Sequence, residues 1–136
     1  MKLMISRKIW LRGEGPSNSK LLRTTDQKMC CLGILLEQSG VDRAHLADRG
    51  SPAGIFHDMP DLPVAMRFLA FNRQGERDDT TVCRLLININ DTRVGSIAEV
   101  GVFPGHMNFL MESEQLREAK ITEIFAPQGI TVQFID

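Results

Sequence analysis

The spacing of apolar residues predicts strands near the two ends of the chain and helices between them. Alternation of apolar and polar positions indicates strands over residues 2–5 and 130–135. In four other segments, apolar residues recur every three or four positions, as on the buried face of a helix. These segments are residues 27–39, 61–72, 80–89 and 113–126. We therefore predict an α+β fold, with helices packed on a small antiparallel sheet that includes both ends of the chain.

The helix predicted over residues 27–39 is apolar on most of its faces, so we expect it at the centre of the domain. Asp26 is expected to cap its start, and Gly40 to end it in a left-handed conformation. Gly33 costs about 1 kcal/mol relative to Ala inside a helix, and its expected use is to let another backbone pack closely. The predicted core combines this helix with two others through Leu32, Leu35, Leu36, Val82, Leu85, Leu86, Ile121, Ile124 and Phe125.

With 136 residues, the chain is long enough for one domain, and we treat residues 1–136 as that domain. Residues 92–111 are ambiguous. Ser96 and Glu99 form a capping-box pattern, but repeated Gly and Pro residues exclude a long helix. An edge strand over residues 100–103 fits equally well.

The charge balance excludes some partners and locates a basic segment. The net charge of −1 argues against a DNA mimic and against a dedicated binder of duplex DNA. Residues 1–28 nevertheless hold seven Lys and Arg against two acidic residues, a net charge of +5. This excess indicates either a contact with phosphate or an acidic partner, or an ordinary solvated strand and loop.

The localisation expected from the sequence is the cytoplasm. No apolar stretch is long enough to span a bilayer, and the first residues reach a charge too soon for the apolar core of a signal peptide. Three cysteines, an odd number without a secretory signal, indicate reduced thiols. Cysteine and histidine have no metal-ligand spacing, so we expect neither a metal site nor a cofactor.

The vicinal pair Cys30 and Cys31 leaves two interpretations open. A thiol near a helix start can ionise easily and act as a nucleophile in a small hydrolase or transferase. Such an enzyme needs a base, for which the candidates are His45, His57 and His106. Alternatively, both cysteines are small packing residues of the central helix, which suits the general tendency of free cysteine to be buried.

A second candidate site lies in the basic N-terminal segment. Trp10, Arg12, Glu14 and Arg23 are the predicted binding residues, because Trp and Arg dominate interaction hot spots. The loop over residues 13–19 would expose the backbone there, and Glu14 would orient Arg12 or accept a hydrogen bond from the partner. The competing account places Trp10 in the core and pairs Arg12 with an acidic residue of the last helix, Glu118 or Glu123.

Several of these segments together resemble a group of small uncharacterised proteins encoded by phages, prophages and other mobile elements. The resemblance rests on Trp10-Leu11-Arg12-Gly13-Glu14-Gly15, Leu21-Leu22-Arg23, Lys28-Met29-Cys30-Cys31-Leu32-Gly33, Asn90-Asp91, Glu118-Ala119-Lys120-Ile121, Glu123-Ile124-Phe125 and Gly129-Ile130. It covers about two-thirds of the chain, and Cys-Cys-Leu-Gly is its most specific element. Residues 92–111 depart from the pattern and are interpreted as an insertion. The resemblance implies a phage-type accessory protein in a bacterial cytoplasm and assigns no catalytic residue.

Three functions remain open from the sequence. The favoured one is a non-enzymatic protein that binds a host or phage macromolecule, for example as an inhibitor of a host defence system. The second is a small cysteine-dependent hydrolase or transferase that uses Cys30 or Cys31. The third is a weak nucleic-acid binder that acts through the basic N-terminal segment.

Overall fold

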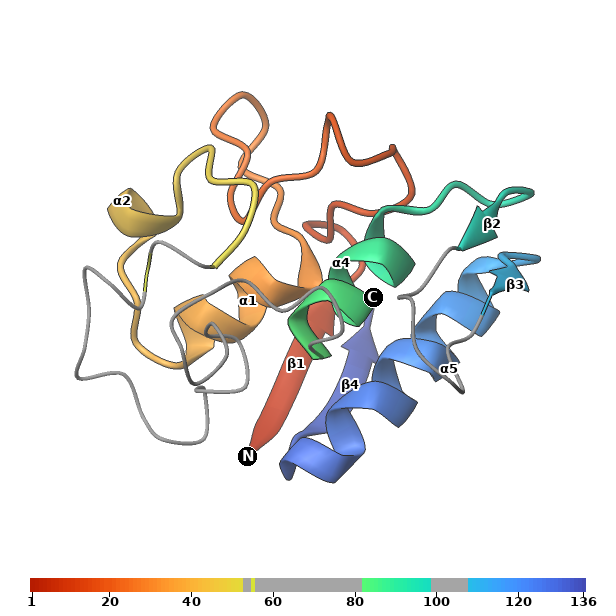
Figure 1. Ribbon diagram of the computed structural model, residues 1–136. Coiled ribbons are helices and arrows are strands. Elements are labelled where there is room, and N and C mark those ends of the chain that lie inside the picture. Colours follow the sequence, from red (N-terminus) through yellow and green to blue (C-terminus); the bar gives the residue numbers. More distant parts are fainter. Residues whose placement is uncertain (53–54, 56–81, 99–107) are drawn as a thin grey trace, which may run out of the picture.

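The computed structural model describes residues 1–52, 55, 82–98 and 108–136, which form helices and short strands around an apolar core (Figure 1). The first half of the chain contributes strand β1 (Lys2–Ser6), helix α1 (Cys31–Gln38) and the one-turn helix α2 (Arg43–Leu46). The second half contributes helix α4 (Val82–Asp91), strands β2 (Ile97–Ala98) and β3 (Phe109–Leu110), helix α5 (Glu114–Phe125), the 3-10 turn η2 (Ala126–Gln128) and strand β4 (Thr131–Ile135). The predicted mixture of α and β structure is confirmed. The helix predicted over residues 61–72 lies outside the described residues.

Strands β1 and β4, from opposite ends of the sequence, lie side by side and pair in parallel (Figure 1). Leu3 pairs with Val132, and Ile5 pairs with Phe134. Both predicted end strands therefore belong to the sheet, but the predicted antiparallel direction is wrong. Alternation determines which face of a strand is buried and leaves its direction open. The direction follows from α5, which runs back along the sheet before η2 turns the chain into β4.

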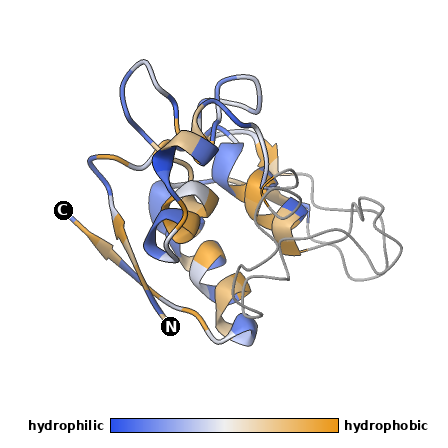
Figure 2. Ribbon diagram, turned by 90° about the vertical axis from the view of Figure 1, so that its left-hand side faces the viewer, coloured by the Kyte–Doolittle hydropathy of each residue, from blue (hydrophilic) through white to orange (hydrophobic). Residues whose placement is uncertain are grey.

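The helices lie on one side of the β1–β4 pair (Figure 2). Leu3 and Ile5 point to that side and are fully buried, whereas the residues that alternate with them are more exposed. Most of the predicted core is confirmed. Leu32, Leu35, Leu36, Leu86, Ile121 and Phe125 are buried, and Val82, Leu85 and Ile124 are partly buried and pack against the core.

Helix α1 is the predicted central helix, and its first six residues are buried. It begins at Cys31, four residues later than expected, with Cys30 in the N-cap position. Asp26 does not cap it, because its carboxylate accepts a hydrogen bond from Arg23 at 2.6 Å. Gln27 has a φ of 62°, which is incompatible with a right-handed helix. Gly40 follows the helix with a φ of 101°, as predicted.

Gly33 has the predicted role of allowing a close approach. A Cβ atom added to Gly33 would lie 1.8 Å from the carbonyl oxygen of Leu21, so no side chain fits there. The segment that contains Leu21 and Leu22 crosses α1 at this point, and both leucines are buried. The glycine thus permits backbone-to-backbone packing at the middle of the domain.

Helix α5 begins and ends as the sequence predicts. The side chain of Ser113 accepts a hydrogen bond from the backbone N–H of Leu116 at 3.1 Å, which caps the first turn. At the other end, Gly129 adopts a φ of 76° after η2 and releases the chain into β4. The start of the helix predicted over residues 80–89 lies outside the described residues, but α4 covers the rest of it.

The ambiguous residues 92–111 contain the short antiparallel pair of β2 and β3. Ile97 lies opposite Leu110, and Ala98 lies opposite Phe109. The strand predicted over residues 100–103 and one partner of the predicted capping box, Glu99, lie outside the described residues.

Candidate functional site

The segments singled out in the sequence meet at the C-terminal end of α4, where the amide of Asn90 joins them. Its Oδ1 accepts hydrogen bonds from Nε1 of Trp10 at 2.8 Å and from the backbone N–H of Cys31 at 3.2 Å. Its Nδ2 donates to the carbonyl of Leu11 and to the carboxylate of Asp91, both at 3.0 Å. Asn90 is 1% exposed, so this network is internal.

Two further groups satisfy the last carbonyls of α4, which have no partner within the helix itself. The guanidinium of Arg117, on α5, donates to the carbonyls of Ile89 and Asn90 in α4 and to that of Thr92 just after it. In the N-terminal loop, Gly13 donates to the carbonyl of Asn90 at 2.9 Å. A Cβ atom added to Gly13 would lie 2.9 Å from Nη2 of Arg117, so the loop lies directly on the guanidinium. The Gly13–Gly15 segment thus covers the C-terminal end of α4.

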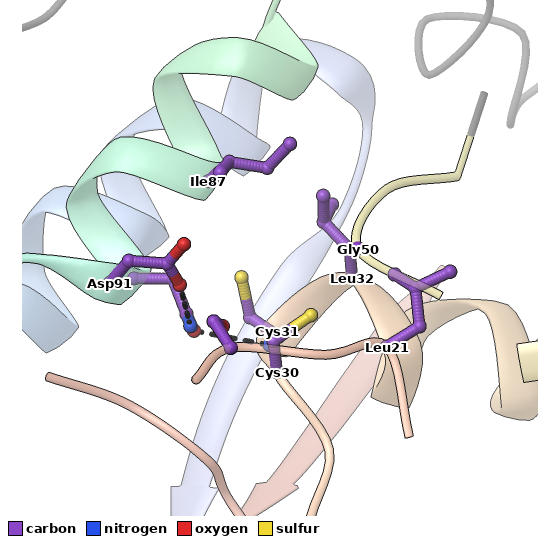
Figure 3. Close-up of a pocket in the computed structure, with 9 residues that line it drawn as sticks. Leu21, Cys30, Cys31, Leu32, Gly50, Ile87 and Asp91 are labelled. Carbon is purple, nitrogen blue, oxygen red and sulfur yellow. Dashed lines mark hydrogen bonds between the residues drawn. The ribbon is translucent and has the colours of Figure 1, made fainter. Parts of the chain in front are cut away.

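A small pocket lies beside this network, between α4, the start of α1 and the segment around Ser19 (Figure 3). Both thiols line it, Cys31 from the first position of α1 and Cys30 from its N-cap, and Asp91 faces them from α4 (Figure 3). Its enclosed volume is about 10 Å³, which holds about one water molecule. No histidine is among the described residues that line it. The pocket therefore has no room for a substrate, and within the described part of the chain the titratable group that faces the thiols is the carboxyl group of Asp91 rather than a histidine.

Burial keeps the two thiols of this pocket protonated. It raises the pKa of Cys30 to about 12, and the charge of Asp91 adds to this effect. Burial also raises the pKa of Cys31 well above its usual value, with smaller contributions from Cys30 and Asp91. A nucleophilic cysteine needs a lowered pKa and access to solvent. The arrangement favours the packing role that the sequence left open, with Cys30 7% exposed and Cys31 fully buried.

The same burial acts on Asp91. It raises the pKa of this carboxyl group, while hydrogen bonds from Ser19 and Asn90 and the charge of Arg117 act in the opposite direction. Each of these groups is part of the network at the end of α4. We therefore assign Asp91 a structural role in that network.

Trp10, one of the predicted binding residues, is only 2% exposed, so its indole lies in the interior. Its ring packs against Phe134 with 5.0 Å between the centroids. The guanidinium of Arg12 stacks over it at 4.5 Å and forms an ion pair with Glu114 at 3.0 Å. The competing account is therefore correct in placing Trp10 in the core. This account also correctly places the partner of Arg12 on the last helix, α5, but that partner is Glu114 and not Glu118 or Glu123.

The remaining predicted binding residues form an ion-pair cluster of their own. Arg23 contacts Glu14 at 2.7 Å and Asp26 at 2.6 Å. The prediction that Glu14 orients Arg12 is therefore wrong, because Glu14 pairs with Arg23 instead. Arg7 pairs with Glu118 at 2.6 Å, so part of the basic excess of the N-terminal segment is neutralised by α5.

The structure reveals an exposed apolar group that the sequence analysis missed. We call it the ribbon patch; it consists of Val94, Ile97 and Leu110, which are 49%, 54% and 44% exposed. Ile97 and Leu110 are directly opposed across β2 and β3 and share one face. On the other face Ala98 is buried, and Phe109 packs against the core. The ribbon patch is thus the outward side of a ribbon that is anchored on its inward side.

Two buried polar residues were also missed, although the sequence holds a signal for each. Asn90 follows Leu86 by four positions, and Arg117 precedes Ile121 by four, so both continue the buried stripe of their helix. A polar residue on such a stripe indicates an internal hydrogen-bonding role. The ribbon patch had no comparable signal, because its exposure depends on how a two-residue strand is oriented.

Metal-ligating side chains, membrane-spanning helices and similarity to known proteins indicate no further site in the described part of the chain. Among residues 1–52, 55, 82–98 and 108–136, no group of three or more His, Cys, Asp or Glu side chains is placed to hold a metal ion. Within the same part of the chain, no helix has the length and apolar character that crossing a membrane requires. No family model matches the chain, and no curated protein and no solved structure matches it.

Proposed function

We propose that the protein is a non-enzymatic accessory protein of phage type that binds another protein, of host or phage origin, in a bacterial cytoplasm. The observation that carries this proposal is the ribbon patch. Single exposed apolar residues are ordinary on a protein surface, whereas adjacent ones with much of their area in water mark interaction sites. Inhibition of a host defence system is one activity that such binding would serve.

The ribbon patch suits a partner with an apolar surface. Ile97 and Leu110 are a cross-strand pair, so their side chains form one continuous apolar spot, with Val94 at the preceding turn. Burying such side chains against a partner gains roughly 25 cal/mol for each Å² removed from water. Because Ala98 is buried on the other face of the ribbon, Ile97 and Leu110 are held in place before a partner binds. This lowers the entropy cost of association.

The two alternative functions have less support. The thiol-enzyme alternative requires an ionised, accessible cysteine, and Cys30 and Cys31 have the opposite properties. The nucleic-acid alternative relies on the seven basic side chains of the N-terminal segment, and three of them, Arg7, Arg12 and Arg23, are each paired with a carboxylate.

The test compares the double variant Ile97→Asp, Leu110→Asp with wild type in affinity purification from a bacterial lysate, followed by titration of the purified partner. We expect wild type to bind the partner, and the double variant to lose at least about tenfold in affinity, or about 1.4 kcal/mol. The matched control is Ile9→Asp, which changes an apolar residue 37% exposed and outside the ribbon. It should bind normally.

Two further variants separate the alternatives. Cys30→Ser should bind as wild type does, and so should the double variant Arg12→Ala, Arg23→Ala. Loss of binding only in the arginine variant would move the interface to the N-terminal segment. An activity abolished by Cys30→Ser in a folded protein would instead support the thiol enzyme and contradict the proposal.

A further inference from the structure

Along the outer edge of β1, a glutamine side chain forms the two backbone hydrogen bonds that a neighbouring strand would otherwise form. Gln38, the last residue of α1, accepts a hydrogen bond from the backbone N–H of Met4 at 3.1 Å and donates one to its carbonyl at 2.6 Å. At the end of β1, the carbonyl of Ser6 accepts hydrogen bonds from the backbone N–H groups of Ile9 and Trp10. Another strand therefore cannot pair along β1.

The outer edge of β4 is open. In a parallel pair, alternate residues direct both backbone groups toward the neighbouring strand. Thr131 donates to Met1, and Ile135 accepts from Arg7, so the odd-numbered residues of β4 face β1. The N–H and C=O groups of Val132 and Phe134 consequently point away from β1. Within the described residues, none of these groups has a hydrogen-bond partner.

The sequence of this edge lacks the usual protection. Edge strands of monomeric proteins commonly carry a lysine, a proline or a bulge that prevents pairing with other chains. Strand β4, Thr-Val-Gln-Phe-Ile, has no charged residue and no proline, and it pairs with β1 without interruption. An uncharged edge of this kind favours association with another strand.

We propose that β4 pairs antiparallel with β4 of a second copy of this chain, which joins the two sheets into one with strand order β1-β4-β4-β1. The edge is self-complementary about a two-fold axis that passes beside Gln133. Val132 of each copy then lies opposite Phe134 of the other, and each of these two pairs exchanges two backbone hydrogen bonds. This register satisfies every open group of Val132 and Phe134.

The side chains agree with this register. Val132 and Phe134 lie on the helix-covered face, where they form a β-branched and aromatic cross-strand pair, a favourable combination. The exposed Gln133 of each copy meets its equivalent on the other face, so no like charges are opposed. A second copy of the chain matches the backbone groups and side chains of β4 at each of these positions. The proposed dimer does not involve the ribbon patch.

The first experiment measures oligomeric state by analytical ultracentrifugation at about 100 μM protein, where a dimer with a micromolar Kd is nearly complete. Wild type should sediment as a dimer. Val132→Pro removes an N–H that points away from β1, so the β1–β4 ladder should persist while dimerisation weakens at least about tenfold. The matched control Val132→Thr keeps the N–H and the branched shape, and should remain dimeric. Circular dichroism checks that the variants are folded.

The second experiment tests the register. Gln133→Glu alone and Gln133→Lys alone each place like charges opposite one another at the axis, so each variant should be monomeric at low salt. An equimolar mixture of the two should form a heterodimer. A monomeric wild type would overturn the proposal, and so would a wild-type dimer that persists in Val132→Pro or in both Gln133 variants.

Discussion

Asn90 is the residue on which most of the internal polar contacts converge. It connects the N-terminal segment, through Trp10 and Leu11, to the start of α1 at Cys31 and to the neighbouring Asp91. Buried polar groups are tolerated when all of them are hydrogen-bonded, and they then favour one arrangement of the chain over others. The Asn-Asp pair thus has a structural role, and the network also holds the backbone of the Cys-Cys pair at Cys31.

We predict that Asn90→Ala lowers the free energy of unfolding by at least about 3 kcal/mol. The substitution leaves the N–H groups of Trp10 and Cys31 and the carbonyl of Leu11 without a partner, and each such loss costs about 1–3 kcal/mol. Urea denaturation followed by Trp10 fluorescence measures the change. The control Asn18→Ala removes one exposed hydrogen bond and should cost less than about 0.5 kcal/mol. Equal effects would show that the network contributes little.

We also predict that stability falls as the pH rises above about 9. In the unfolded chain, thiols ionise near pH 8.5, whereas Cys30 stays protonated up to about pH 12 in the folded protein. The folded state then holds more protons than the unfolded state, so the free energy of unfolding decreases with pH in this window. The measurement is urea denaturation between pH 7 and pH 10.5. Cys30→Ala, Cys31→Ala should flatten the decrease, and an unchanged decrease would contradict this explanation.

At the scale of elements, the sequence correctly predicts the helix ends that nearby capping residues and glycines determine. Helix α5 was correctly placed because Ser113 caps it and Gly129 ends its last turn. The start of α1 was wrong because Asp26, a good cap in isolation, binds Arg23 instead, a contact made by the turn before the helix. The direction of β4 and the burial of Trp10 depend on contacts distant in sequence, which local patterns do not contain.

The crossing at Gly33 gives an element-scale prediction. Gly33→Ala should destabilise the protein by about 1–3 kcal/mol, although alanine is the better helix former by about 1 kcal/mol. The reason is the carbonyl of Leu21, which belongs to the backbone and has to move with its whole segment. Thermal denaturation measures the change. Gly50→Ala is the matched control, because a Cβ atom there meets nothing within 4 Å; it should leave the melting temperature nearly unchanged.

At the scale of the whole molecule, the pairing of β1 with β4 closes the fold. The strands bring residues 2–6 beside residues 131–135, so almost the entire described chain lies between two paired segments. Leu3 and Ile5 depend on this pairing for their place between the sheet and the helices. Such distant contacts form slowly, because closing a long loop costs entropy before any contact is gained.

A chain that ends at Gly129 should consequently fail to fold cooperatively. Without β4, Trp10 loses its packing against Phe134, and the backbone of β1 loses its parallel partner. We expect a broad thermal transition and binding of an apolar dye, in contrast to the sharp transition of the full chain. A synthetic peptide of residues 130–136, added in excess, should restore part of the cooperative transition. A sharp transition in the shortened chain alone would contradict the importance given to β4.

The parallel pairing of the two end strands also has a consequence for biosynthesis. Leu3 and Ile5 leave the ribosome before the helices that cover them, and β4, the strand that completes their sheet, leaves after those helices. Until β4 has been synthesised, β1 therefore has no strand to pair with, and its apolar side chains are open to chaperones and proteases. A message cut short before β4 yields a product that cells remove rather than accumulate. The fold thus makes the synthesis of β4 a condition for survival of the protein.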